Sequence, residues 1–170
     1  MEEQIINRVA GSQLITFDLE EYSSPFERVL FDIKDNLFQG LILKEKDFRD
    51  FIKSHDWSQY KGKNVAVYCS VDAVIPTWAY MLLTIALQPF ANKIVFGNLE
   101  ALENQLFYDA LSKVEWQKFQ GAKVVIKGCS KVFVPTAAYL EATDRLRNYA
   151  SSIMFGEACS TVPLYKRAKS

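Results

Sequence analysis

The sequence has few of the residues that mark many catalytic and secreted proteins. Its 170 residues include one histidine and three cysteines, Cys69, Cys129 and Cys159. A single histidine leaves few choices for a general base, and no Ser-His-Asp order stands out. An odd number of cysteines does not suit the disulfide framework of a small secreted domain. The cysteine count therefore favours a reducing cytoplasm.

The sequence also lacks net charge and long apolar runs. Twenty basic residues balance twenty acidic ones, so no overall field recruits nucleic acid or a membrane. The N-terminus is acidic where a secretory signal is basic, and the most apolar stretch, "AVIPTWAYMLLTIALQPF", is interrupted by prolines. Neither a G-x-G-x-x-G nor a P-loop motif occurs, which removes the usual support for dinucleotide and nucleotide binding. We expect a cytoplasmic protein without nucleic-acid or membrane partners.

An internal repeat with an offset of 59 residues organises the chain. Residues 76–97 align without a gap on residues 135–156, and ten of these 22 pairs are identical. The same offset pairs Trp57 with Trp116 and Gly62 with Gly121. Duplication at such a period is typical of a chain built from two similar supersecondary units. We interpret residues 1–170 as a single domain with N-terminal strands (1–36), two repeats (37–97 and 98–156) and a C-terminal tail (157–170).

Each repeat alternates helical periods with short valine-rich runs, which predicts an α/β fold with parallel strands joined by right-handed crossovers. The predicted architecture is a three-layer sandwich with about five mostly parallel strands. The segments "LITFDL" and "RVLFDI" are predicted to add an N-terminal antiparallel strand pair. The helix "PTWAYMLLTIALQ" is apolar all round and must be covered, either by the N-terminal segment or by a second subunit. A homodimer is therefore predicted.

All three cysteines occur as Cys-Ser and precede Val-Pro or Ile-Pro, in "CSVDAVIP", "CSKVFVP" and "CSTVP". Cys69 and Cys129 follow predicted strands, at the edge where open parallel sheets bind ligands. If their two strands are central neighbours, the two thiols face each other. The repeat offset places Cys159 at the position of Glu100. Three thiolates and a carboxylate could bind zinc or an iron–sulfur cluster, with Glu100 or Asp72 as the fourth ligand.

Serine and threonine residues lie close to these cysteines in the sequence. We expect four of them to hydrogen-bond to thiolates or to a bound anion: Ser70, Ser130, Thr77 and Thr136. Two alternatives stay open. The chain could be a thiolate-dependent enzyme or sulfur carrier, with Cys69 or Cys129 as the nucleophile. It could equally be an interaction module whose cysteines are inert and buried.

Two resemblances bear on these alternatives. The segment "NVAVYCSVDAVIPTWAYML" resembles the strand–cysteine–helix of rhodanese-like sulfur transferases, which would make Cys69 a persulfide carrier, although its loop has no basic residue. The segments "HDWSQYKGKNVAVYCSVDAVIPTWAYMLL", "KIVFGNLE" and "SIMFGEACSTVPLYKR" resemble an uncharacterised bacterial family, a domain of unknown function, over nearly the full length. The second resemblance implies a small bacterial cytoplasmic protein and supplies no activity.

Overall fold

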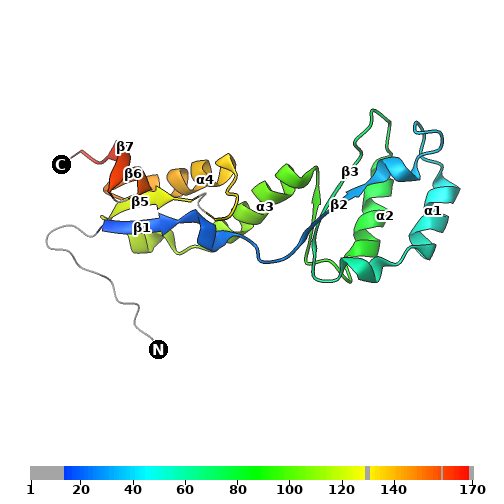
Figure 1. Cartoon of the computed structure of the whole chain (residues 1–170), viewed down its shortest axis with the longest axis horizontal. Coiled ribbons are helices and arrows are strands. Elements are labelled where there is room, and N and C mark those ends of the chain that lie inside the picture. The colour runs from blue at the N-terminus through cyan, green and yellow to red at the C-terminus, as the bar shows by residue number, and fades with distance from the viewer. Residues whose placement is uncertain (1–13, 129–130, 158, 169–170) are drawn as a thin grey trace. The chain divides into compact units, whose positions relative to one another are not determined.

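The computed structural model describes residues 14–128, 131–157 and 159–168 and shows a mixed α/β architecture (Figure 1). The strands in these residues are β1 (Leu14–Asp18), β2 (Arg28–Asp32), β3 (Asn64–Tyr68), β4 (Lys93–Phe96), β5 (Lys123–Lys127), β6 (Ser152–Glu157) and β7 (Ser160–Lys166). The α-helices are α1 (Glu45–Ser54), α2 (Thr77–Leu87), α3 (Leu99–Ser112) and α4 (Thr136–Arg147). Short 3-10 helices are η1 (Leu19–Tyr22), η2 (Ile33–Asn36), η3 (Trp57–Tyr60) and η4 (Trp116–Phe119).

The chain divides into two compact units, each with its own sheet. Unit 2 comprises residues 25–105 and contains a three-stranded sheet of order β2-β3-β4, in which both pairings are parallel. Central strand β3 is buried from Asn64 to Val67, as expected for a parallel strand covered on both faces. The predicted α/β class with mostly parallel strands is confirmed. The prediction that the whole chain is a single domain stays a prediction.

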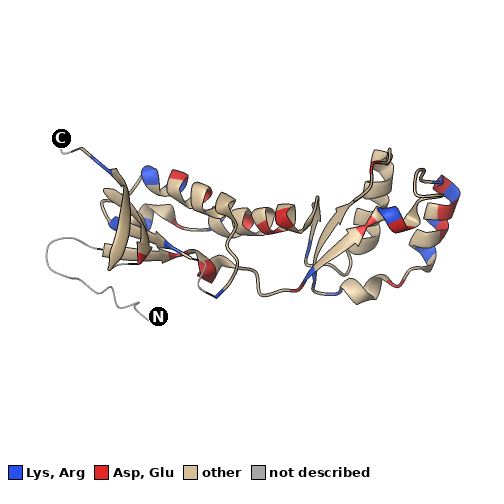
Figure 2. Cartoon of the chain, turned by 45° about the horizontal axis from the view of Figure 1, so that its top comes forward, with Lys and Arg blue, Asp and Glu red and all other residues tan. Residues whose placement is uncertain are grey.

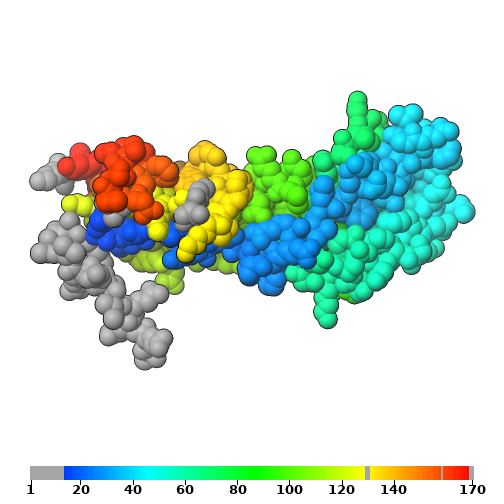
Figure 3. All heavy atoms as spheres, in the orientation of Figure 1, coloured from blue at the N-terminus to red at the C-terminus, as the bar shows by residue number. Residues whose placement is uncertain are grey.

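Unit 1 is made of two separate stretches of chain, residues 1–24 and 106–170. Its sheet has the order β1-β5-β6-β7, with β1, β5 and β6 parallel and β7 antiparallel to β6. Strand β1 thus pairs with a strand that follows more than a hundred residues later. In the space-filling view, the blue N-terminal strand lies beside the yellow and orange segments of its own unit (Figure 3).

The pairing of the first two strands differs from the prediction. Strands β1 and β2 do not form an antiparallel pair, because each is the parallel partner of a later strand in a different sheet. The segment predicted as a C-terminal tail also differs from the prediction, because Ser160–Lys166 forms strand β7. The antiparallel pair of this fold is therefore β6–β7. Strands β3 and β5 belong to different sheets, so the condition under which Cys69 and Cys129 would face each other as ends of neighbouring strands is not met.

The same local contacts recur in both units. The carboxylates that end β1 and β2 accept backbone hydrogen bonds two residues later, Asp18 from Glu20 N–H at 3.0 Å and Asp32 from Lys34 N–H at 3.1 Å. The indole N–H groups of Trp57 and Trp116 each donate to a carbonyl five residues earlier, at 2.7 and 3.1 Å. These pairs are what a duplication would produce, and the duplication itself stays a prediction.

A second pair of equivalent residues consists of two glycines with positive φ angles. Gly62 and Gly121 have φ angles of 71° and 73° in the turns before β3 and β5. Only glycine adopts this left-handed conformation without steric cost. Each N–H then donates to a carbonyl just before the next strand, Phe90 at 2.9 Å and Tyr149 at 3.0 Å. The two glycines therefore fix how the central strand starts in each sheet.

Helices α1 and α2 of unit 2 expose different kinds of residue to solvent. Figure 2 shows basic and acidic residues along α1, where Lys46 pairs with Asp50 at 3.2 Å and Arg49 with Glu45 at 2.9 Å. Helix α2 has no charged residue, and its Met81 and Ile85 are exposed. Exposure of this apolar side is consistent with the predicted homodimer, which stays a prediction.

Within the described residues, no helix combines the length and the apolar character that crossing a membrane requires.

Candidate functional site

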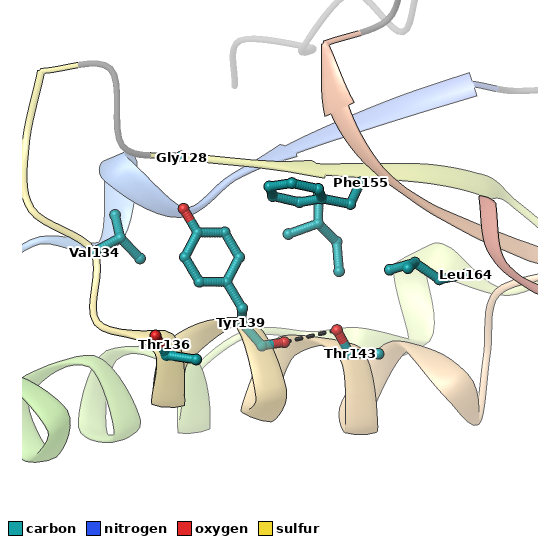
Figure 4. A pocket seen from close by; sticks show the side chains of 8 residues that line it. Gly128, Val134, Thr136, Tyr139, Thr143, Phe155 and Leu164 are labelled. Atoms are coloured by element: carbon teal, nitrogen blue, oxygen red, sulfur yellow. Dashed lines mark hydrogen bonds between the residues drawn. The ribbon is translucent and has the colours of Figure 1, made fainter. Parts of the chain in front are cut away.

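A pocket of about 480 Å³ opens at the carboxyl edge of the parallel strands of unit 1 (Figure 4). It lies between the ends of β5 and β6 on one side and helix α4 on the other. Its lining residues are Ile126, Gly128, Val134, Thr136, Tyr139, Thr143, Phe155 and Leu164. Open parallel sheets bind ligands at this edge, and the volume is within the range of small-molecule sites.

Tyr139 stands at the centre of this pocket. Its ring meets Phe155 edge to face, with centroids 5.8 Å apart and an interplanar angle of 81°. Figure 4 shows its hydroxyl directed toward Gly128. Its backbone carbonyl accepts a hydrogen bond from the Thr143 hydroxyl at 2.7 Å. The tyrosine is thus oriented by neighbours on β5, β6 and its own helix.

Gly128 makes room for that hydroxyl. A Cβ atom added to Gly128 would lie 2.8 Å from the Tyr139 hydroxyl and 3.3 Å from side-chain atoms of Leu19 and Val134. Carbon and oxygen atoms do not approach so closely without displacement, so any larger residue here would push Tyr139 or the strand end away. The missing side chain is therefore one physical cause of the pocket.

The corresponding position in unit 2 is occupied by Cys69. Gly128 follows Lys127, which pairs with Asp18, and Cys69 follows Tyr68, which pairs with Asp32. Although Cys69 and Cys129 open similar motifs, the 59-residue offset and the strand registers both place Gly128 at the position of Cys69. The Cys69 side chain packs against the core of unit 2. The same strand end thus carries a thiol in one unit and a space in the other.

Cys69 lies within a small polar cluster at the carboxyl edge of β2 and β3. The half-buried thiol donates a hydrogen bond to the Val71 carbonyl at 3.5 Å, and Ser70 N–H donates to Asp32 Oδ1 at 3.0 Å. Burial raises the pKa of the Tyr80 phenol, and the nearby Cys69 and Asp32 raise that pKa further. The three side chains therefore lie near one another at this edge of the sheet.

The pKa of Asp32 reflects two opposing effects. Burial raises the pKa of this carboxyl, but hydrogen bonds from Ser70 and from Lys34 N–H, together with the Lys34 ammonium, outweigh burial and lower it. Hydrogen bonds to the ionised form stabilise the carboxylate. Asp32 is therefore held as an anion that fixes the Cys-Ser turn.

In unit 1, the equivalent aspartate also pairs with a lysine, which here lies on the neighbouring strand β5. Asp18 forms an ion pair with Lys127 at 3.2 Å, and this hydrogen bond, followed by the charges of Asp18 and Glu157, raises the pKa of the Lys127 ammonium. The Glu20 carboxylate accepts a hydrogen bond from Lys131 N–H at 2.8 Å. These contacts hold Lys127 and the backbone of Lys131 in place.

The predicted metal ligands are distributed over the two units. Cys69, Asp72 and Glu100 belong to unit 2, whereas Cys129 and Cys159 belong to unit 1. Asp72 and Glu100 are exposed, and Cys159 is a free, exposed thiol in the turn between β6 and β7. Cys129 lies outside the described residues. Within the residues that are described, no group of three or more His, Cys, Asp or Glu side chains is placed to hold a metal ion.

The residues predicted to supply hydroxyl groups are also divided between the two units. Thr136 lines the pocket of unit 1, and the backbone of Ser70 is bonded to Asp32 in unit 2. Thr77 is the exposed first residue of α2, and Ser130 falls outside the described part of the chain. Only Thr136 therefore joins a cavity. The expectation that these residues contact a thiolate or an anion stays a prediction.

Sequence reasoning missed the main residues of the pocket. Tyr139, Phe155 and Gly128 are not among the site residues predicted from the sequence. One signal was present: "VYCS" in the first repeat corresponds to "IKGCS" in the second, with an added glycine between strand and cysteine. A glycine placed at a strand end often marks a close approach to the backbone.

Comparisons with known proteins give one match. Residues 3–167 match a family described as "Protein of unknown function (DUF2480)". No curated protein matches the chain, and no solved structure does.

Proposed function

The chain belongs to the DUF2480 family, which has no known function, and we propose that it binds a small organic molecule in the pocket of unit 1. The observation that carries this proposal is the cavity at the carboxyl edge of β5 and β6, into which Tyr139 and Thr136 bring hydroxyl groups. Mostly apolar walls with a few convergent polar groups are the usual composition of a ligand site.

The two units offer a matched pair of variants for testing this proposal. Phe155 forms one wall of the pocket and meets Tyr139 edge to face, while Phe96 makes the same kind of contact with Tyr80 in unit 2, at 5.1 Å. Both phenylalanines are exposed, so replacing either by alanine should be tolerated by the fold. Only Phe155→Ala removes a wall of the pocket.

The measurement is ¹⁹F NMR of the full chain with a set of fluorinated aromatic alcohols, amides, acids and amines. We expect at least one compound to bind the wild-type chain, and its affinity to fall about tenfold or more in Phe155→Ala, which corresponds to about 1.4 kcal/mol. Phe96→Ala should bind as the wild type does. No binding by any compound, or equal loss in both variants, would contradict the proposal.

A metal- or cluster-bound state is a second candidate. It is supported by Cys159, whose exposed thiol lies in the turn that follows the carboxyl end of β6. Thiolates are strong ligands for zinc and iron–sulfur clusters. Zinc or iron with sulfide, measured by elemental analysis and absorption on anaerobically purified protein, should fall to background in Cys159→Ser. Metal retained by that variant would exclude Cys159 as a ligand.

We also propose that the protein resides in a reducing cytoplasm. Cys69 and Cys159 are both free thiols, and Cys159 is exposed. Exposed free thiols persist where glutathione and thioredoxin keep them reduced.

A further inference from the structure

Strand β4 has one open edge where its counterpart in unit 1 has a partner. The offset of 59 residues places β4 on β6, with Phe96 at the position of Phe155. Strand β6 lies between β5 and the antiparallel strand β7, whereas in the described residues β4 pairs with β3 alone. Strands β1 and β2 are outer strands in both units, so this edge is where the two sheets differ.

The paths of the chain after β4 and β6 explain the difference. After Gly156 the chain turns back and forms β7, but after Gly97 it enters helix α3 at Leu99. Residues 25–105 of unit 2 are all described, and none of their strands returns along the outer side of β4. A strand that covers this edge must therefore come from outside unit 2.

Two residues of β4 direct their backbone groups toward the open edge. On the other side, Gly97 N–H donates to the Val67 carbonyl of β3 at 3.0 Å. Because these groups alternate in direction along a strand, the N–H and C=O groups of Ile94 and Phe96 point away from β3. A row of such groups at a sheet edge is a template for pairing with another strand.

Side chains beside this edge are equivalent to part of the pocket wall of unit 1. There, Leu164 of β7 lines the pocket together with Thr143 and Phe155. The equivalents of the last two residues in unit 2, Thr84 and Phe96, are both exposed. Phe96 is 72 % exposed, against 43 % for Phe155, which has β7 beside it. Pairing of a strand with β4 would therefore bury an aromatic ring as well as the backbone groups.

We propose that the open edge of β4 pairs with β4 of a second copy of this chain, in antiparallel orientation about a twofold axis at Val95. Ile94 of each copy then exchanges backbone hydrogen bonds with Phe96 of the other. The axis is perpendicular to the sheet, so the same face of both sheets is covered by α2. Since Phe96 contacts Tyr80 of α2, its ring lies on that face, beside Ile94 of the other copy.

Three properties of the chain suit a second copy as the partner. An antiparallel pair of identical strands satisfies both edges at once, as a twofold interface requires. Basic and acidic residues are equal in number, so no net charge repels two copies. Helix α2 lies beside β4 and has no charged residue, so the α2 helices of the two copies bring no like charges together.

Sedimentation velocity of the full chain at micromolar concentrations measures the association. We expect the wild type to be a dimer, and Phe96→Pro to raise the dimer dissociation constant about tenfold or more, because proline removes an N–H group that crosses the interface. The bonds between β3 and β4 are kept, since this N–H points away from β3. Phe133→Ala, which replaces a similarly exposed aromatic residue of unit 1, should leave the dissociation constant unchanged.

The variant Val95→Cys tests the pairing without proline. The axis places the two introduced thiols on a non-hydrogen-bonded pair of antiparallel strands, whose Cα atoms are about 4.5 Å apart and within reach of a disulfide. Under mild oxidation, we expect a disulfide-linked dimer on a non-reducing gel, above the background that the wild type gives through its exposed Cys159. Thermal unfolding verifies that each variant is folded.

A monomeric wild type would overturn the proposal. A dimer that is equally stable in folded Phe96→Pro would overturn it too, as would a Val95→Cys chain that forms no more disulfide than the wild type. Equal weakening in Phe133→Ala would place the interface elsewhere and would also overturn it. The pocket of unit 1 is unaffected by these outcomes, because its ligand binding is measured separately.

Discussion

Asp32 shows how one carboxylate organises the turn that carries Cys69. Its Oδ1 accepts hydrogen bonds from Ser70 N–H at 3.0 Å and from Lys34 N–H at 3.1 Å. Burial raises its pKa, but the hydrogen bonds from Ser70 and Lys34 outweigh burial and lower it. The contribution of this carboxylate to stability is therefore fully present above the ordinary aspartate pKa, about 3.9, and is lost as pH falls through the lowered folded-state pKa.

Replacing Asp32 by asparagine keeps the accepting oxygen and removes the charge. We expect Asp32→Asn to lower the free energy of unfolding at neutral pH. The difference from wild type should begin to shrink below about pH 4 and should vanish once the pH has fallen through the lowered folded-state pKa, where the wild-type carboxyl is neutral too. Urea unfolding between neutral and acidic pH measures this difference. Asp50→Asn, at an exposed position of α1, is the control. A difference that stays constant with pH would show that the charge of Asp32 does not matter.

Elements were predicted well where local signals determine them. Helices α2 and α4 start directly after Pro76 and Pro135, and the valine-rich runs form the central strands β3 and β5. The tryptophan corners occur in both units. These features depend on residues within a few positions of each other, so the sequence alone indicates them.

The residues at the carboxyl edge of each sheet were predicted less well, because a shift of one residue changes which side chain lies at the end of a strand. Register sets Gly128 at the strand end where unit 2 has Cys69. The 59-residue offset of the repeat already aligns Gly128 with Cys69, but it does not indicate that Tyr139 packs against this glycine. That contact joins a strand end to helix α4 and depends on tertiary packing.

At the scale of the whole molecule, two separate apolar cores explain the two units. Phe17 of β1 is buried among Trp116 and Phe119 of unit 1, and Phe31 of β2 is buried beside Trp57 and Tyr60 of unit 2. The chain thus places the first strand of unit 1 before the whole of unit 2. Completing unit 1 requires contacts across a long sequence separation, which slows folding.

Paired alanine variants should reveal this division. Phe17→Ala and Phe31→Ala each remove a buried aromatic ring, which typically costs about 3–5 kcal/mol of stability. We expect Phe17→Ala to raise amide hydrogen exchange mainly in β5 and α4, and Phe31→Ala mainly in β3 and α2. Mass spectrometry of deuterated peptides measures both patterns. If each variant raised exchange equally throughout the chain, the two cores would form one cooperative unit.

The sequence by itself determined the α/β class, the positions of the central strands and their following helices, and the edge at which a site should form. These follow from periodicity, turn residues and the geometry of parallel sheets. Only the tertiary structure decided which strands pair, because "LITFD" pairs with β5 and "RVLFD" with β3, strands that lie far from them in the sequence. The pocket was likewise a tertiary outcome: it forms where Gly128, Tyr139 and Phe155, from three different elements, leave space between strand ends and helix.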